Sequence, residues 1–276
     1  MSSNSLSGNL IRGAKNLVQK KIKNPFQKVG WSWFTVKKLK HLPNRPGQTV
    51  NFLDKTIHFY SPAELVHGVT EIFVQELYAQ KLGGSPYIID CGANIGLSVI
   101  YIKKMYPGAQ IVAFEPDPVN FDLLNKNVKN FNLDSVELKK EAVWIADTTL
   151  NFDGEGSMSS KISEEQGKGA NLVKACRLRD YLNRTVDFLK IDIEGAEYAV
   201  LKDCHDQLKL VNNLFLEYHG SFKQGPELIE MLQWIEQAGF VFYIKEATTV
   251  FATPFSRQKT GMVPYEVQLN IFCFRP

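Results

Sequence analysis

The stretch "YIIDCGANIG" at residues 87–96 decides the fold, because an apolar run ends there in an acid and breaks into a turn with two glycines. This pattern is typical of a buried strand followed by a ligand-binding turn. Gly92 and Gly96 allow the backbone to turn sharply and to approach a ligand closely. A helix predicted over residues 95–105 would offer its first amide groups to a carboxylate. The stretch therefore predicts a small-molecule site at the end of this strand.

The residues after this turn alternate between apolar strands and amphipathic helices. Further helices are predicted over residues 118–131, from near residue 194, and over residues 226–238. The predicted strands are "AQIVAFE" (109–115), a strand-like region "SVELKKEAVW" (135–144), "VDFLKIDI" (186–193), "NNLFLEY" (212–218), "FVFYIKE" (240–246) and "EVQLNIFCF" (266–274). Apolar strands separated by helices indicate a parallel sheet covered on both faces. The last two strands lack an intervening helix and should form an antiparallel hairpin at one edge.

Charge is distributed unevenly along the 276 residues. Residues 1–50 contain ten Lys or Arg and no acid, which leaves 22 basic against 29 acidic residues, or a charge of −7, for the remainder. We expect a basic, partly helical N-terminal extension over residues 1–50 and one main domain over residues 51–276. Residues 10–18 have amphipathic helical spacing, which suits either a solvated helix packed on the main domain or a surface for anionic lipid or nucleic acid. We favour the packed helix. "WSWF" at 31–34 could dock the extension or line a substrate cleft, and we favour docking.

Three further features bear on localisation. The four cysteines form no CxxC pair and lie mostly in apolar runs, which indicates buried free thiols in a reducing compartment. No apolar stretch approaches the roughly twenty residues that span a bilayer. The N-terminus lacks the apolar core of a signal peptide. We therefore expect a cytoplasmic protein. A helix is also predicted upstream of the first strand, over residues 64–81.

The acids at the ends of the first two strands indicate which ligand the turn holds. The turn is not the GxGxxG loop that admits a pyrophosphate, since Asp90 precedes Gly92 and a single Gly96 follows. An acid in that place suits an ammonium group. Glu115 ends the second strand, 25 positions after Asp90, where a carboxylate can accept hydrogen bonds from both hydroxyls of a ribose. An amino acid at one end and a ribose at the other describe S-adenosylmethionine.

The motifs "IIDCGANIG", "AFEPDP", "EAVW" and "LKIDIEGAE" together resemble the FkbM family of S-adenosylmethionine-dependent methyltransferases, over about residues 71–274. The resemblance implies a class I methyltransferase fold: an α/β, Rossmann-like three-layer sandwich with a seven-stranded, mostly parallel sheet and an antiparallel terminal hairpin. It implies methyl transfer, most often to a hydroxyl of a sugar or a secondary metabolite, by the domain over residues 51–276.

The resemblance also assigns cofactor-binding residues. Those at the methionine end would be Asp90, Gly92, Ala93, Asn94 and Gly96. Glu115 would bind the ribose, with Pro116 fixing the turn that presents it. Ala142 and Val143 would flank the adenine, although the same two residues also suit the core of the sheet.

Chemistry is expected after the fourth strand, in "KIDIEGAE". Asp192 would face the cofactor sulfonium or the acceptor, while Glu194 and Glu197 would contact the acceptor or cap the following helix. His219 is the candidate general base, because an unperturbed histidine has a pKa near neutrality. Asp192, Glu217 and His219 could instead bind Mg²⁺ or Mn²⁺, which oxygen-rich ligands favour, but the spacing demands no metal.

Two other function classes stay open from the sequence. One is a nicotinamide-dependent Rossmann oxidoreductase, against which the absent GxGxxG loop argues. The other is a non-catalytic cofactor-binding module with a basic interaction arm, against which the acids at 90, 115 and 192 argue. We expect a small-molecule or glycan acceptor. A nucleic-acid acceptor is disfavoured, because "DIEG" stands where a base-flipping enzyme would have Asn or Asp before Pro-Pro and an aromatic residue. Peripheral membrane contact by the N-terminus stays open, and the sequence gives no oligomeric state.

Overall fold

The computed structural model describes residues 24–153, 161–163, 171–261 and 264–276. The amphipathic segment expected at residues 10–18 lies outside this part of the chain. The α-helices are α2 (Trp33–Lys40), α3 (Pro62–Val69), α4 (Leu97–Met105), α5 (Pro118–Asn130), α6 (Glu197–Cys204) and α7 (Gly225–Gln237). The short helical turns are η1 (Pro25–Val29), η2 (Thr70–Val74), η3 (Leu178–Tyr181), η4 (His205–Leu210), η5 (Phe222–Gln224) and η6 (Pro254–Ser256). Within the described ranges, no helix has the length and apolar character needed to cross a membrane.

A seven-stranded sheet forms the centre of the molecule, in the order β12-β15-β11-β10-β3-β4-β5. Its strands are β3 (Tyr87–Cys91), β4 (Gln110–Phe114), β5 (Val136–Lys139), β10 (Val186–Ile191), β11 (Val211–Gly220), β12 (Val241–Glu246) and β15 (Val267–Phe274). Neighbouring strands from β5 to β11 run parallel, whereas β15 is antiparallel to both β11 and β12. The predicted mostly parallel sheet with an antiparallel terminal hairpin at one edge is confirmed.

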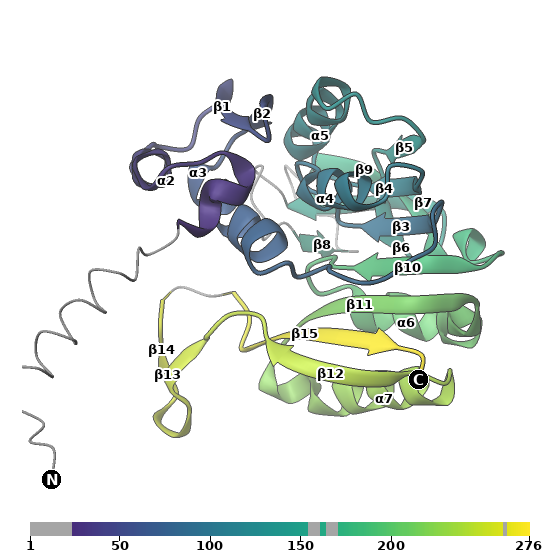
Figure 1. The fold of residues 1–276 in the computed structure, drawn as a ribbon. Coiled ribbons are helices and arrows are strands. Elements are labelled where there is room, and N and C mark those ends of the chain that lie inside the picture. The colour runs from purple at the N-terminus through teal and green to yellow at the C-terminus, as the bar shows by residue number, and fades with distance from the viewer. Residues whose placement is uncertain (1–23, 154–160, 164–170, 262–263) are drawn as a thin grey trace, which may run out of the picture.

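Helices cover both faces of this sheet, which gives the predicted three layers (Figure 1). On one face, Ile88 and Ile111 pack in a common core with Ile100 of α4 and Leu124 of α5. On the other, the strands pack against α6 and α7, in a core that includes Ile89, Leu189, Val200, Met231 and Ile235. Alternate residues of each strand therefore enter different cores, as expected for strands buried on both faces.

A second sheet follows β5, in the order β6-β9-β7-β8. Its strands are β6 (Ala142–Trp144), β7 (Thr148–Asp153), β8 (Lys161–Ser163) and β9 (Asn171–Arg177). The strand-like region predicted over residues 135–144 is thus divided, since β5 belongs to the central sheet and β6 to this smaller one. Two short hairpins complete the fold: β1 (Gln48–Phe52) with β2 (Lys55–Phe59), and β13 (Phe251–Thr253) with β14 (Gln258–Lys259).

Residues 24–59 pack on the α4 and α5 side of the central sheet. Trp31 is only 2% exposed; it stacks with Phe26, meets Phe52 edge to face, and donates a hydrogen bond from Nε1 to the Asn51 carbonyl at 2.6 Å. This confirms the docking expected of "WSWF" for Trp31, while Trp33 and the residue after it stay exposed. The domain boundary expected between residues 50 and 51 falls inside β1.

The helix predicted over residues 64–81 is wrong in its extent. α3 begins at Pro62, behind the Ser61 hydroxyl that accepts a hydrogen bond from Glu64 N, and it continues into η2 only as far as Val74. The last turn is widened, because Gln75 N donates to the carbonyl of Thr70. Glu76 then takes a left-handed φ of +56°, which ends the helix before the glycines that were expected to stop it.

Candidate active site

The turn after β3 is shaped by a close approach of two backbones. Gly92 has φ +89°, and a Cβ atom there would lie 1.9 Å from the backbone oxygen of Asp192, the residue that follows β10. The amides of Gly92 and Ala93 both donate to the Phe114 carbonyl at the end of β4. Gly96, also left-handed, leads into α4 and packs against Leu124. The glycines thus bring the ends of β3, β4 and β10 together around one turn.

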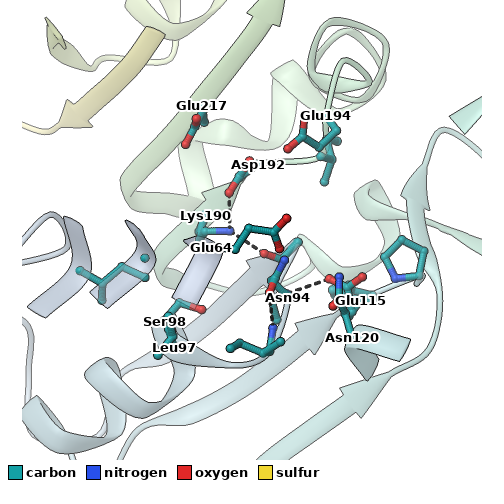
Figure 2. Close-up of a pocket in the computed structure, with 18 of the residues that line it drawn as sticks. Glu64, Asn94, Leu97, Ser98, Glu115, Asn120, Lys190, Asp192, Glu194 and Glu217 are labelled. Carbon is teal, nitrogen blue, oxygen red and sulfur yellow. Dashed lines mark hydrogen bonds and ion pairs between the residues drawn. The ribbon is translucent and has the colours of Figure 1, made fainter. Parts of the chain in front are cut away.

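A cavity opens at this edge of the central sheet, between the turn and α3 (Figure 2). The predicted site residues that line it are Gly92, Ala93, Asn94, Glu115, Pro116, Ala142, Val143, Asp192 and Glu194. Those that do not line it are Asp90, Gly96, Glu197 and His219. The structure therefore brings most of the predicted cofactor residues into one cavity wall, and it places the remainder behind that wall.

Glu115 holds the turn from the side of β4. It is 6% exposed, and its two carboxylate oxygens accept hydrogen bonds from Asn94 N at 2.7 Å and from Asp117 N at 2.9 Å. Burial raises the pKa of Glu115 to about 8, in spite of these two backbone donors. Each carboxylate oxygen retains a second lone pair for a hydroxyl donor from the cavity. Asp117 caps α5 and so fixes the segment that follows Glu115.

Asp90 lies behind the cavity and binds a buried lysine. Its side chain is fully buried, accepts a hydrogen bond from the Ser98 hydroxyl at 2.5 Å, and lies 3.3 Å from Lys190 Nζ. The ammonium group of Lys190 also lies 3.1 Å from Asp192 and donates to the Gly92 carbonyl at 2.7 Å. Burial opposes the charge of Lys190, but Asp192 and Asp90 outweigh burial and hold the pKa of its ammonium group well above the ordinary value.

Lys190 is the site residue that the sequence analysis missed. It lies opposite Asp90 in the parallel register of β3 and β10, so both side chains leave the same face of the sheet. The signal was a single charge in the apolar strand "VDFLKIDI". A lysine is almost never fully buried without a paired charge, so its position predicts a buried partner without naming it.

The acidic end of the cavity is formed by Asp192, Glu194 and Glu217: the first two lie in the turn after β10 and the third lies on β11. Burial raises the pKa of Glu194 to about 8, and burial with the nearby charge of Asp192 raises the pKa of Glu217. Glu194 has φ +56°, and its carbonyl accepts a hydrogen bond from the Tyr265 hydroxyl at 2.7 Å. This strained turn presents the Glu194 carboxylate toward Asp192 (Figure 2).

Glu197 and His219 support this turn from behind. The buried Glu197 carboxylate accepts hydrogen bonds from Ile193 N and Gly195 N, at 3.2 and 2.9 Å, and its Oε1 lies 3.0 Å from His219 Nδ1. These bonds hold the turn before α6, and among the described residues no side chain caps the helix itself, so neither role predicted for Glu197 is established. Burial alone would lower the pKa of His219, but Glu197, Glu217 and Glu194 outweigh it and raise that pKa well above the ordinary value.

The prediction that His219 is a general base relied on a pKa near neutrality, whereas its acidic neighbours raise that pKa well above the ordinary value; the catalytic role itself stays a prediction. A raised pKa favours the protonated imidazole, which has no lone pair to accept a further proton. His219 also lies outside the lining of the cavity. Its observed place is that of a buried side chain, 4% exposed, bridging Glu197 and the acidic end.

Ala142 and Val143 are core residues of the smaller sheet, and their contact with adenine stays a prediction. They are almost fully buried in β6 and pair with β9, and they also line the cavity beyond Pro116. The opposite wall comes from α3 and the hairpin before it, which the sequence analysis gave no role. The lining residues from this wall include Tyr60, Ser61, Glu64, Leu65 and Glu71.

Two features define a class I methyltransferase. The central sheet has β15 as its single reversed strand, and the cavity lies at the carboxyl ends of β3, β4 and β10. Sequence comparison narrows this class, because residues 90–242 match the sequence model described as the methyltransferase FkbM domain. The chain belongs to the FkbM methyltransferase family. The protein is thus an S-adenosylmethionine-dependent methyltransferase, which confirms the predicted family and cofactor and sets aside the oxidoreductase and the non-catalytic module.

Relatives of this chain include methyltransferase sdnD of Sordaria araneosa, 34% identical over 202 residues that cover 59% of this chain and 78% of that protein. The AMB antimetabolite synthetase AmbE of Pseudomonas aeruginosa is 30% identical over 197 residues, which cover 54% of this chain and only 9% of that protein. A crystal structure of methyltransferase FkbM from Methylobacillus flagellatus KT has a TM-score of 0.49 at 16% identity. The match covers 74% of this chain and 47% of that one.

Proposed function

We propose that the protein transfers the methyl group of S-adenosylmethionine to a hydroxyl of a small molecule, a sugar or a secondary metabolite. The observation that carries this proposal is that Asp192, Glu194 and Glu217 line one end of the same cavity whose other residues include Glu115 and the turn after β3. Carboxylates accept hydrogen bonds and so select acceptors that carry O–H donors. A relative named as an antimetabolite synthetase supports an acceptor from secondary metabolism.

The chain's own residues fit the cofactor at three points. Glu115 offers its remaining lone pairs to the ribose hydroxyls, while the amides of Asn94 and Asp117 hold the carboxylate in place. Ala142 and Val143 give an apolar surface of the kind that suits adenine. The methionine end falls to the turn over residues 92–96, where Gly92 permits the close backbone approach. Asp90 acts here through Ser98 and Lys190, since it does not reach the cavity.

Methyl transfer from a sulfonium is an in-line displacement, so the protein mainly positions the acceptor oxygen and stabilises the reacting groups. When bound, the cofactor supplies an activated methyl group. The carboxylates of Asp192, Glu194 and Glu217 then orient the acceptor by hydrogen bonds to its hydroxyls. Lys190 and Glu197 keep Asp192 and the turn over residues 193–195 in place. The acceptor oxygen would take the methyl group, the cofactor would leave as S-adenosylhomocysteine, and the hydroxyl proton would pass to solvent water.

The proposal is tested in two stages on the full chain. Calorimetric titration with S-adenosylmethionine and S-adenosylhomocysteine, with NAD as a control, should show binding of the adenosyl ligands alone. At pH 9, where Glu115 is ionised, Glu115→Ala should weaken that binding at least tenfold, because two hydrogen bonds to a charged group are lost, each worth about 1.5–3 kcal/mol. Glu236→Ala removes an exposed carboxylate on α7 and should leave the affinity unchanged.

The second stage identifies the acceptor atom. The protein is incubated with trideuteromethyl-labelled cofactor and matched panels of hydroxyl, amine and carboxylic-acid compounds, and the products are analysed by mass spectrometry and NMR. Label on a hydroxyl oxygen supports the proposal. Label on nitrogen or carbon alone would refute the hydroxyl acceptor while leaving methyl transfer intact, and absence of cofactor binding would refute the cofactor assignment.

A further inference from the structure

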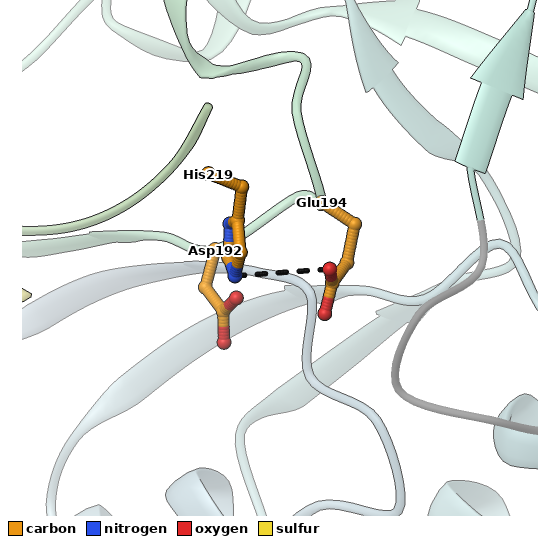
Figure 3. A group of neighbouring side chains, drawn as sticks. All are labelled: Asp192, Glu194 and His219. Atoms are coloured by element: carbon orange, nitrogen blue, oxygen red, sulfur yellow. Dashed lines mark ion pairs between the residues drawn. The ribbon is translucent and has the colours of Figure 1, made fainter. Parts of the chain in front are cut away.

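The acidic end of the cavity has the geometry of a cation site. One ligand atom each from Asp192, Glu194 and His219 lies within 4.8 Å of the others, and the three side chains converge in Figure 3. His219 Nε2 is 3.7 Å from Glu194 Oε2 and 3.5 Å from Glu217 Oε1. These separations are long for hydrogen bonds, which prefer about 2.7–3.2 Å. A bound ion would draw the ligands slightly closer, because metal–ligand bonds of about 2.0–2.2 Å separate adjacent ligand atoms by roughly 3–3.6 Å.

The orientation of His219 provides a second, independent observation. Its side chain is 4% exposed, and Nδ1 is held by Glu197, so Nε2 points toward Asp192 and Glu194 (Figure 3). Nε2 makes no hydrogen bond of ordinary length to any described residue. A histidine that binds a metal through one nitrogen commonly donates its other N–H to a carboxylate, which fixes the ring. Glu197 stands in that relation to His219.

A buried acceptor atom beside Glu217 has no hydrogen bond to a described residue. Asn270 of β15 lies opposite Glu217 in register, so the two side chains leave the same face of the sheet. Asn270 is 1% exposed, and its Oδ1 accepts no hydrogen bond within the described part of the chain. A buried acceptor of this kind is normally satisfied by protein or by water. A hydrated ion beside Glu217 would bring such a donor.

The lining of the cavity is also predominantly acidic, as suits a cation site. Seven acidic residues and one lysine line it, and that lysine, Lys190, is already shared between Asp90 and Asp192. The sulfonium of the cofactor brings a single positive charge. A divalent ion would neutralise carboxylates that are otherwise crowded together away from water.

We propose that Asp192, Glu194 and His219 bind one divalent cation of the Mn²⁺ and Mg²⁺ class, which holds and activates the acceptor hydroxyl. This inference rests on the proposed function. The ion takes the place of the proton on His219 Nε2. With the ion bound, the acceptor hydroxyl loses its proton to solvent water, its oxygen forms the bond to the methyl carbon, and the electron pair of the broken carbon–sulfur bond stays on sulfur. Two carboxylates suit Mn²⁺ and Mg²⁺, and the imidazole favours Mn²⁺ of the two.

The test uses the full chain, purified with EDTA and dialysed free of it. Calorimetric titration with MnCl₂ should show one site per chain, and MgCl₂ should bind the same site more weakly. Asp192→Asn and Glu194→Gln should each lower the Mn²⁺ affinity at least tenfold. Glu236→Gln, an exposed carboxylate on α7, should not change it. Pulsed electron paramagnetic resonance of bound Mn²⁺ should show modulation from one imidazole nitrogen, and His219→Gln should abolish that modulation.

The outcomes separate this inference from the proposed function. Binding of S-adenosylhomocysteine in EDTA without any Mn²⁺ or Mg²⁺ site would overturn the cation and leave the methyltransferase proposal standing. Mn²⁺ binding that survives both Asp192→Asn and Glu194→Gln, or that shows no nitrogen modulation, would place the ion elsewhere and also overturn it. Circular dichroism and thermal melting of each variant establish that a loss of binding is not a loss of fold.

Discussion

Glu115 provides the sharpest prediction, because a buried carboxyl with a raised pKa makes stability depend on pH in an unusual direction. Burial raises the pKa of Glu115 from 4.5 to about 8 in the folded protein. Between these values the folded state binds a proton that the unfolded chain has released. Stability is therefore favoured at low pH and falls as pH rises. From pH 6 to pH 9 the contribution of this one group to the free energy of unfolding should fall by about 2–3 kcal/mol.

The perturbation is Glu115→Gln, which keeps the shape and removes the titration. Urea unfolding of wild type and variant is measured at pH 6, 7, 8 and 9, and the difference in free energy of unfolding is plotted against pH. The absolute difference also contains a constant cost of about 1–3 kcal/mol, because the amide NH₂ would face Asn94 N or Asp117 N, which are both donors. The slope isolates the ionisation of Glu115, and the exposed Glu236→Gln should keep the wild-type slope.

A second readout follows from the same group. Ribose hydroxyls donate hydrogen bonds, so the ionised carboxylate should bind the cofactor better, and affinity for S-adenosylhomocysteine should rise with pH toward 8 and then level off. In Glu115→Gln this dependence should disappear. Parallel pH profiles for wild type and Glu115→Gln would refute the reasoning. They would mean that the two backbone N–H donors outweigh burial and keep Glu115 ionised below pH 6.

Three further substitutions test how the site is built. Gly92→Ala should destabilise the protein by at least about 3 kcal/mol in urea unfolding, because the added Cβ would lie 1.9 Å from the backbone oxygen of Asp192. Gly47→Ala is the control: Gly47 has φ +76° but open space around it, so this change should cost only about 1–2 kcal/mol. Lys190→Met should lower the free energy of unfolding by about 3–5 kcal/mol, because it leaves Asp90 unpaired. Adding Asp90→Asn to this variant should restore part of that free energy. If the double variant instead lost the sum of the two single losses, the pairing would be contradicted. Asn127→Ala should lower the free energy of unfolding by about 2–3 kcal/mol, because the Asn127 side chain accepts a hydrogen bond from His58 N and donates to the carbonyls of His58 and Ile95. Hydrogen exchange of the His58 amide should become faster. Unchanged exchange at His58 would contradict this role of Asn127.

The fold could be predicted because its evidence is local and repeated. Each strand of the central sheet is a short apolar run, and the motifs after β3, β4 and β10 occur in the order that the family shows. Residue positions that depend on one strand end, such as Glu115 and Asp192, were therefore placed correctly in the cavity wall. Asp90 was expected in the same wall but lies behind it, because it contacts Ser98 of α4 and Lys190, on a strand about a hundred residues away.

Two other misses have the same physical origin. The helix over residues 64–81 has a continuous amphipathic pattern, yet it ends at Glu76 through a backbone conformation that the side-chain pattern does not encode. His219 was judged by its intrinsic pKa, whereas acids from α6, β11 and the turn after β10 raise its pKa well above the ordinary value. Burial and pairing across elements set these properties, and neither can be read from the identity of the residue alone.

The role of Gly92 joins these observations. The sequence suggested that this glycine admits a ligand, while the structure shows that it first admits the backbone of Asp192. That contact closes β10 against β3 and brings Lys190 within reach of both Asp90 and the Gly92 carbonyl. Because Lys190 is held by Asp90 from one side, it can hold Asp192 from the other, at the point where the cofactor turn meets the acidic end. A substitution of Lys190 should therefore disturb cofactor binding and Mn²⁺ binding together, although Lys190 belongs to neither set of ligands.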